Sequence, residues 1–178
     1  LYLPRPGLQP AGDIPGRANC GAINMKDPDS LTLVTPIGMI AIRTCNDAIT
    51  ALEWVDAETD RPNTPLLNEA ARQLEAYFAG TLEDFDLPLD PEGTVHQKKV
   101  WTEMLTIPYG GLRTYGEIAT AIGSAARAVG TACGKNPIPI IVPCHRVIAT
   151  GGGMGGYSGR GGLETKHTLL TLEKALLA

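Results

Sequence analysis

Apolar residues follow two different patterns along the chain, and the change between them near residue 90 limits the possible folds. Residues 31–35, 37–43 and 49–55 are alternating or continuous apolar runs, which predict three strands. Residues 66–78 carry apolar side chains at helical spacing, at Leu67, Ala70, Ala71, Leu74 and Phe78. The first part of the chain, residues 25–90, is therefore predicted to be a small sheet-plus-helix domain.

The chain beyond residue 93 is typical of a helical domain. A first helix is predicted over 95–105, with its inward side formed by Val100, Trp101, Met104 and Leu105. A last helix is predicted over 163–177, and the segment 88–93 is the expected linker. The fold class is thus α/β (α+β), with a mainly helical C-terminal domain over 94–178.

A helix-turn-helix is predicted in the middle of this second domain. Thr114, followed three residues later by Glu117, matches a capping box, so a helix starts at Tyr115 and runs to about Ile122. Gly123-Ser124 forms the turn, Ser124 is the expected N-cap of the next helix, and that helix covers 125–133. Helix, tight turn and helix is the geometry of a DNA-reading motif, although an ordinary helical hairpin shares the pattern.

The composition fits a globular protein and excludes some classes. The chain has 178 residues, 43% of them hydrophobic, and no apolar stretch long enough to span a bilayer. Residues 1–24 are rich in proline and glycine and are interpreted as a disordered arm. The spacing of the four cysteines fits neither a disulfide framework nor a zinc site, so Cys20 and Cys45 are interpreted as free thiols in a reducing, cytoplasmic compartment.

Charge is divided unevenly between the two parts. Residues 1–95 carry 6 Lys+Arg and 15 Asp+Glu, whereas residues 96–178 carry 9 Lys+Arg and 4 Asp+Glu. The first part is therefore acidic and the second basic, although the whole chain has a net charge of −4. A basic part attached to an acidic part places positive potential on one face, which is what attraction of phosphates requires.

The strongest chemical signal is the tetrad Pro143-Cys144-His145-Arg146, which follows the apolar run 138–142. That run predicts a buried strand that would hold the cysteine rigidly at its end. A histidine beside a cysteine favours the thiolate, which is the nucleophilic form. On its own the pair is ambiguous, because most single cysteines after an apolar run are inert core thiols and adjacent extended residues point to opposite faces.

Several ordered motifs surround the tetrad. Upstream are Val100-Trp101, Ile107-Pro108-Tyr109-Gly110, Thr114-Tyr115-Gly116, Ala125-Ala126-Arg127-Ala128-Val129-Gly130 and Asn136-Pro137; downstream are Gly156-Tyr157-Ser158-Gly159 and Gly162-Leu163-Glu164-Thr165-Lys166. In this order the set closely resembles the O6-alkylguanine-DNA alkyltransferase family, the methylated-DNA–protein-cysteine methyltransferases. The resemblance is strong in the second half and weaker over 31–90.

The resemblance implies a role for each matched residue. Cys144 is the alkyl acceptor, His145 activates it through a water, Glu173 orients that histidine, and Asn136 braces the cysteine turn. Tyr115 serves the guanine ring nitrogen, and Arg127 takes the place of the flipped nucleotide. The remaining implied contacts are to DNA, from Thr114, Ala125 and Ala126, and to the base, from Val147, Tyr157 and Ser158.

Three departures from the family pattern stand out. The turn at Gly123-Ser124 is about two residues shorter, which affects the expected docking on DNA. His96 replaces the usual phenylalanine before Gln97. The loop after Tyr157 is about two residues longer and adds Arg160, which we expect to contact phosphate or to widen the alkyl pocket.

The function implied by the resemblance is direct repair of O6-alkylguanine, and also of O4-alkylthymine, by irreversible stoichiometric transfer of the alkyl group to the protein's own cysteine. The expected partner is double-stranded DNA carrying O6-alkylguanine, and the protein is expected to be a monomer. No cofactor, metal or membrane is expected, and in a eukaryote the protein would be nuclear. The residues leave open a DNA-binding module without transfer, a Cys-His-Glu thiol hydrolase and a transcriptional regulator.

Overall fold

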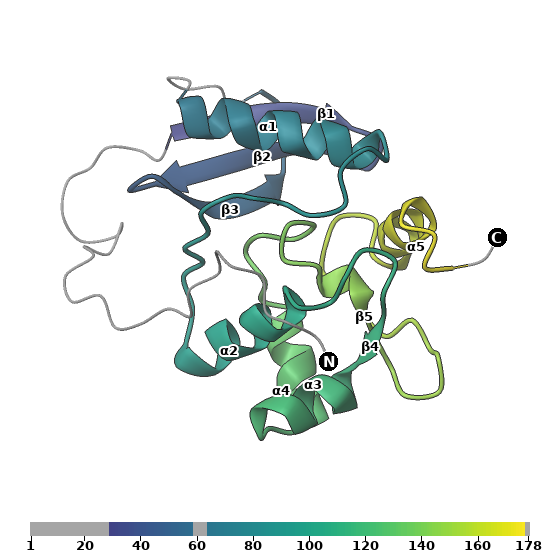
Figure 1. The fold of residues 1–178 in the computed structure, drawn as a ribbon. Helices are drawn as coiled ribbons and strands as arrows, with labels where there is room; N and C mark the ends of the chain where they lie inside the picture. Colours follow the sequence, from purple (N-terminus) through teal and green to yellow (C-terminus); the bar gives the residue numbers. More distant parts are fainter. Residues whose placement is uncertain (1–28, 59–63, 177–178) are drawn as a thin grey trace.

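The computed structural model describes residues 29–58 and 64–176. A three-stranded antiparallel sheet has the order β1-β2-β3, formed by β1 (Asp29–Thr35), β2 (Gly38–Cys45) and β3 (Ala48–Trp54). Helix α1 (Pro65–Phe78) covers one face of this sheet (Figure 1). The three strands and the helix confirm the sheet-plus-helix prediction, with ends shifted by two residues or fewer from those expected.

Helix α1 begins at a well-formed cap and packs one stripe onto the sheet. The Thr64 hydroxyl accepts a hydrogen bond from the Leu67 amide, and Pro65 occupies the first turn, where a missing N–H costs nothing. The fully buried stripe consists of Leu67, Ala70, Leu74 and Tyr77. The expected inward residue Phe78 is only half-buried, because the stripe turns at Tyr77 instead.

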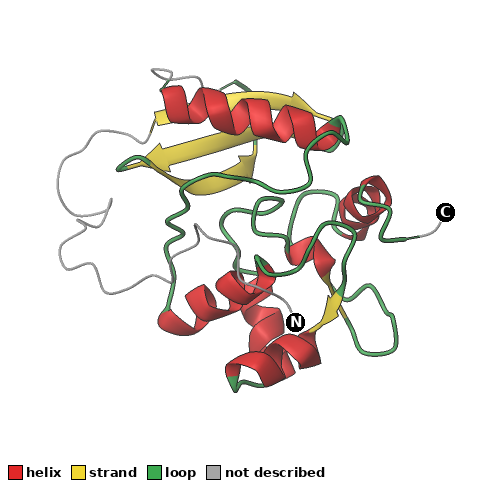
Figure 2. Cartoon of the chain, viewed as in Figure 1, coloured by secondary structure: helices red, strands yellow, loops and turns green. Residues whose placement is uncertain are grey.

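The second part contains four helices and a small parallel sheet. The helices are α2 (Val95–Met104), α3 (Tyr115–Ile122), α4 (Ala126–Cys133) and α5 (Leu163–Leu172), and the short strands are β4 (Arg113–Thr114) and β5 (Val147–Ile148) (Figure 2). Trp101 and Met104 of α2 face inward as predicted, but Leu105 caps the helix and is exposed. The indole N–H of Trp101 donates to the Ala132 carbonyl at 2.9 Å, which ties α2 to α4.

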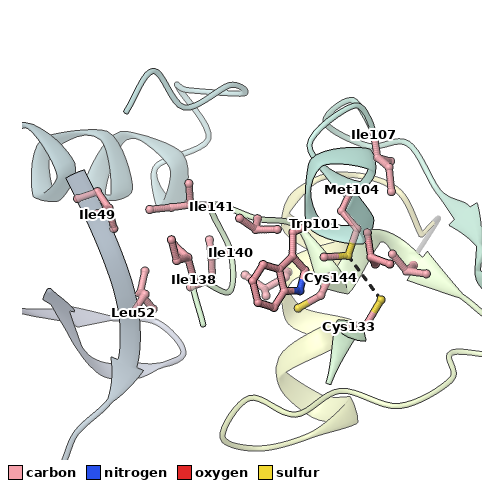
Figure 3. Packing of buried hydrophobic residues seen from close by; sticks show 14 of the residues in the cluster. Ile49, Leu52, Trp101, Met104, Ile107, Cys133, Ile138, Ile140, Ile141 and Cys144 are labelled. Atoms are coloured by element: carbon pink, nitrogen blue, oxygen red, sulfur yellow. Dashed lines mark hydrogen bonds between the residues drawn. The ribbon is translucent and has the colours of Figure 1, made fainter. Parts of the chain in front are cut away.

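One continuous core joins the two parts. Ile49 and Leu52 of β3 lie opposite Ile138 and Ile141 from the second part (Figure 3). The Leu52 amide donates to the Pro137 carbonyl at 2.9 Å, so backbone hydrogen bonding also crosses the boundary. Each large apolar side chain buried here contributes about 1.5–3 kcal/mol. The sheet domain is therefore fixed against the segment that precedes Cys144.

Cys45 is disulfide-bonded in the structure, so the expectation of a free thiol there is wrong. The proposed arm over 1–24 and Cys20 lie outside the described residues. Within residues 29–58 and 64–176, no helix is long and apolar enough to cross a membrane.

Candidate active site

Cys144 lies in a single 3₁₀ turn, η1 (Cys144–Arg146), and not at the end of a strand as the apolar run predicts. The preceding residues 138–142 form only an isolated bridge between Pro139 and Val142. Pro137 and Pro139 cannot donate to a ladder, and Ile140 has a positive φ of 76° that turns the chain. The segment is buried but irregular, and its backbone bonds, such as Val142 N–H to the Ile138 carbonyl at 2.9 Å, are supplemented by a side chain.

The Asn136 side chain helps to fix the shape of this segment. Its side-chain amide donates to the Val142 carbonyl at 2.8 Å, and its side-chain oxygen accepts from the Ile138 amide at 3.1 Å. These two bonds replace the ladder that the prolines prevent. Asn136 therefore lies against the segment that leads to the cysteine, and its role in bracing the cysteine turn stays a prediction.

The Cys144 thiol is buried, with 5% of the residue exposed. Burial raises its pKa, while a hydrogen bond with the Asn136 side chain, the charge of Lys166 and the backbone amides of Cys144 and His145 oppose that rise. Burial prevails, so the resting thiol is protonated. The surroundings nevertheless offer hydrogen bonds to a thiolate once a base has removed the proton.

His145 and Arg146 both contact the Glu173 carboxylate. The His145 Nε2 lies 2.8 Å from Glu173 Oε1, and Arg146 donates from Nε to Oε2 at 2.8 Å and from Nη2 to Oε1 at 2.9 Å. All three side chains are buried. Burial would raise the pKa of Glu173, but hydrogen bonds from His145 and Arg146 lower it to about 2. The carboxylate is therefore ionised and accepts the Nε2 proton of the imidazole.

This tautomer leaves Nδ1 of His145 as the basic nitrogen. Nδ1 is buried and has no hydrogen-bond partner among the described residues. Burial lowers the pKa of His145, and the nearby carboxylate opposes that effect. A neutral imidazole with a free Nδ1 next to a cysteine is a suitable proton acceptor for a thiol.

Glu173 lies at the C-terminal end of α5, which is shorter than predicted. The sequence predicts a helix to residue 177, but α5 ends at Leu172 and Glu173 is its C-cap. Lys174 then has a positive φ of 57°, which turns the chain away. The Glu173 amide still donates to the Leu169 carbonyl at 3.0 Å, and the helix stops because the left-handed Lys174 cannot continue it.

Lys166 is a buried residue near Cys144 to which the sequence reasoning gave no role. Its Nζ donates to the carbonyls of Val147 and Met154, both at 2.5 Å, and its pKa is lowered by burial. It ties α5 to β5 and to the start of the glycine-rich loop. The motif 162–166 contained this lysine, but spacing alone does not distinguish a buried lysine from an exposed one.

Tyr115 and Val147 are brought together by the parallel pairing of β4 with β5. Arg113 pairs with Val147, so the first residue of α3 follows directly beside the strand that leaves the cysteine turn. Burial raises the pKa of the Tyr115 phenol, and hydrogen bonding from the Gly156 backbone opposes that rise. Val147 is fully buried, and its carbonyl accepts the Lys166 bond.

The loop that carries Tyr157 and Ser158 lies against β3. The Tyr157 ring meets Trp54 edge to face, with ring centroids 6.5 Å apart, and its hydroxyl is buried without a partner among the described residues. Ser158 is exposed and lines a 370 Å³ cavity. The other walls of this cavity come from β3, from Gly159, and from residues 134–137 and 139, including Asn136. Trp54 was not expected near the site, because it lies at the end of a strand in the other domain.

Arg160, the residue added by the longer loop, contacts the sheet domain. Its Nη1 lies 2.7 Å from Asp56 Oδ1, and both side chains are largely exposed. A side-chain hydrogen bond from Arg160 lowers the pKa of Asp56. Surface ion pairs of this kind contribute little to stability, because both groups remain hydrated. The expected contact of Arg160 with phosphate stays a prediction, and this pair would compete with it.

The helix-turn-helix exposes the first turn of its second helix, α4. The Thr114–Glu117 capping box is confirmed, and Gly123 ends α3 in the left-handed conformation. The prediction that Ser124 caps α4 is wrong, since Ala125 holds the N-cap position. The Ser124 hydroxyl instead forms a hydrogen bond with His96 Nε2 at 2.8 Å. Residues 125–127 are all exposed. Within the described part of the chain, the Arg127 guanidinium has no hydrogen-bond partner.

Models of one known protein family match nearly the whole described chain. Residues 95–175 match the family model "6-O-methylguanine DNA methyltransferase, DNA binding domain", and residues 31–91 match "6-O-methylguanine DNA methyltransferase, ribonuclease-like domain".

No group of three or more His, Cys, Asp or Glu residues that could hold a metal occurs among residues 29–58 and 64–176.

Individual relatives agree with the family models. A methylated-DNA–protein-cysteine methyltransferase of Mycolicibacterium paratuberculosis is 47% identical over 152 residues, covering 80% of this chain and 90% of its own. The constitutive enzyme of that name from Bacillus subtilis is 44% identical over 155 residues, covering 80% and 93%.

Solved structures show the same fold. The crystal structure of the Mycobacterium tuberculosis O6-methylguanine methyltransferase has a TM-score of 0.74 at 43% identity and covers 85% of this chain and 96% of that one. A structure of the M. tuberculosis protein in complex with DNA has a TM-score of 0.75 at 47% identity, covering 83% and 93%. Because family models match both of its parts, and because the two curated relatives above are covered over 90% and 93% of their length, the chain belongs to the 6-O-methylguanine DNA methyltransferase family.

Proposed function

We propose that the protein repairs DNA by transferring the alkyl group of O6-alkylguanine to its own Cys144, once per molecule. The observation that carries this proposal is the buried hydrogen bond between His145 and Glu173 beside the buried Cys144, in a member of this family. Double-stranded DNA with the lesion is the proposed partner, O4-alkylthymine is a second proposed substrate, and the protein is proposed to act as a monomer.

The proposed reaction begins with removal of the thiol proton. His145 Nδ1 accepts it through a water, and Glu173 balances the resulting positive charge on the imidazole through Nε2. The thiolate then attacks the alkyl carbon, a carbon–sulfur bond forms, and the bond between that carbon and guanine O6 breaks. The departing guanine takes a proton at the ring nitrogen from the Tyr115 hydroxyl, and the proton held by His145 returns through solvent to restore the phenol.

The base must leave the duplex to reach a buried thiol. We assign its replacement in the stack to Arg127, next to Ala125 and Ala126 at the exposed start of α4, with Thr114 contacting the backbone. The flipped base would lie beneath Tyr157 and Ser158, with Val147 in the neighbouring strand.

Intact-protein mass spectrometry tests the function directly. After mixing with a duplex that contains one O6-methylguanine, we expect a gain of one methylene mass that maps to Cys144 and saturates at one per protein. A duplex with unmodified guanine is the control and should give no gain. Lesion binding without a mass gain would indicate a binding module, and catalytic turnover of an ester without DNA dependence would indicate a thiol hydrolase.

Arg127→Ala is expected to slow alkyl transfer more than it weakens binding. If Arg127 fills the gap left by the flipped base, its loss removes stabilisation of the extruded state, which costs a few kcal/mol per unstacked step. We expect a transfer rate lower by about 10- to 100-fold, measured in single-turnover assays. Lys135→Ala, which also removes an exposed cation from this region, is the control. Equal losses in the two variants would show that Arg127 contributes only charge.

A further inference from the structure

The Glu173 carboxylate has a partner in the N-terminal domain. The Tyr77 hydroxyl of α1 donates to Glu173 Oε1 at 2.7 Å, across 96 positions of sequence. Tyr77 is fully buried. Its ring packs against Phe85 and Tyr109, with centroids 5.3 and 6.1 Å away. The phenol is therefore held in place by its ring, independently of its hydroxyl group.

Glu173 Oε1 is shared by three donors. Besides Tyr77 it receives the His145 Nε2 at 2.8 Å and the Arg146 Nη2 at 2.9 Å. Each hydrogen bond to a carboxylate oxygen withdraws some of its negative charge, so each donor weakens the oxygen as an acceptor for the others. The Tyr77 hydroxyl thus limits how strongly Glu173 attracts a protonated imidazole.

We propose that Tyr77 is a positioning residue for alkyl transfer, through which the N-terminal sheet domain orients Glu173 and keeps His145 neutral until the thiol proton is transferred. This inference rests on the proposed function. The acidic N-terminal domain thereby takes part in the chemistry through one hydrogen bond to Glu173. Tyr77 acts through Glu173 and touches neither the thiol nor the base.

The other groups around His145 are consistent with this role. Glu173 favours the imidazolium, whereas Arg146 and Lys166 disfavour it by charge repulsion. Burial, followed by the charge of Glu173, raises the pKa of Tyr77, so the phenol remains a protonated donor wherever histidine titrates. Removal of the Tyr77 hydroxyl leaves more charge on Oε1, which shifts the balance around His145 towards the protonated form.

Tyr77→Phe tests the inference because it removes the hydroxyl and keeps the packed ring. We expect the acid limb of the pH profile of the single-turnover transfer rate to move to higher pH by about half a unit. The sign follows from the larger charge on Glu173, which raises the pKa of His145 and leaves less of the neutral base at a given pH. Tyr109→Phe is the matched control, since the Tyr109 hydroxyl donates to the Leu172 carbonyl at 3.0 Å and not to the carboxylate.

A second measurement separates this inference from the proposed function. NMR titration of the His145 ring nitrogens in the unalkylated protein needs no activity, and Tyr77→Phe should shift its midpoint upward while Tyr109→Phe should not. Replacement of Tyr77 by a fluorinated tyrosine, a stronger donor, should shift it downward. Failure of the wild-type protein to transfer an alkyl group would overturn the function alone. An unchanged His145 midpoint in Tyr77→Phe, or an equal shift in Tyr109→Phe, would overturn the inference.

Discussion

Cys144→Ala is expected to abolish alkyl transfer while DNA containing the lesion still binds. The variant removes the only proposed nucleophile, and loss of a nucleophile typically lowers the rate by about 10⁴-fold or more. Binding should persist because the exposed face of α4 lies on another element. The measurement pairs mass spectrometry for alkylation with a fluorescence assay for affinity on the same duplex.

Cys133→Ala is the matched control for this prediction. Cys133 is the other free cysteine of the described chain, and it is also buried. Its thiol lies 3.5 Å from the Met104 sulfur (Figure 3), and burial raises its pKa to about 12. No Asn side chain supports it, so it should stay unreactive and its loss should leave transfer intact. Alkylation that persists in Cys144→Ala and disappears in Cys133→Ala would show that the acceptor is misassigned.

The elements that the sequence predicted well are those set by local patterns. Strands β1 to β3 follow from apolar runs, and the start of α3 follows from a threonine and a glutamate three residues apart. Such signals need no information about distant parts of the chain. The resemblance to a known family identified Cys144, His145 and Glu173, and the structure brings His145 and Glu173 into contact.

The parts that sequence missed depend on contacts between distant segments. The run 138–142 has the composition of a strand, but its prolines and the Asn136 side chain make it an irregular support. Tyr77 was passed over in favour of Phe78, because a helical pattern does not specify which of two adjacent aromatics faces inward. Arg146 stood inside the most informative tetrad without a role, since only the structure shows its two bonds to Glu173.

Glu173→Gln is expected to destabilise the protein and to slow transfer together. The carboxylate is the buried counter-charge of Arg146, and it also accepts from His145 and Tyr77. Removal of one member of a buried pair leaves an uncompensated charge and typically costs about 3–5 kcal/mol. Chemical denaturation should show this loss. Glu164→Gln, the same change at an exposed position of α5, should cost little.

The pH dependence of the free energy of unfolding separates the effect of the Glu173 charge from the effect of its hydrogen-bonding geometry. The folded-state pKa is lowered to about 2 from an ordinary value of 4.5, so ionised Glu173 stabilises the fold above about pH 4.5. That stabilisation is lost as the pH falls from there towards 2. Glu173→Gln has no carboxyl to protonate, so its stability should fall less steeply over this interval than that of the wild type. Parallel curves for the two proteins would mean that the buried pair carries no net stabilisation, and that Glu173 matters only for holding His145 in place.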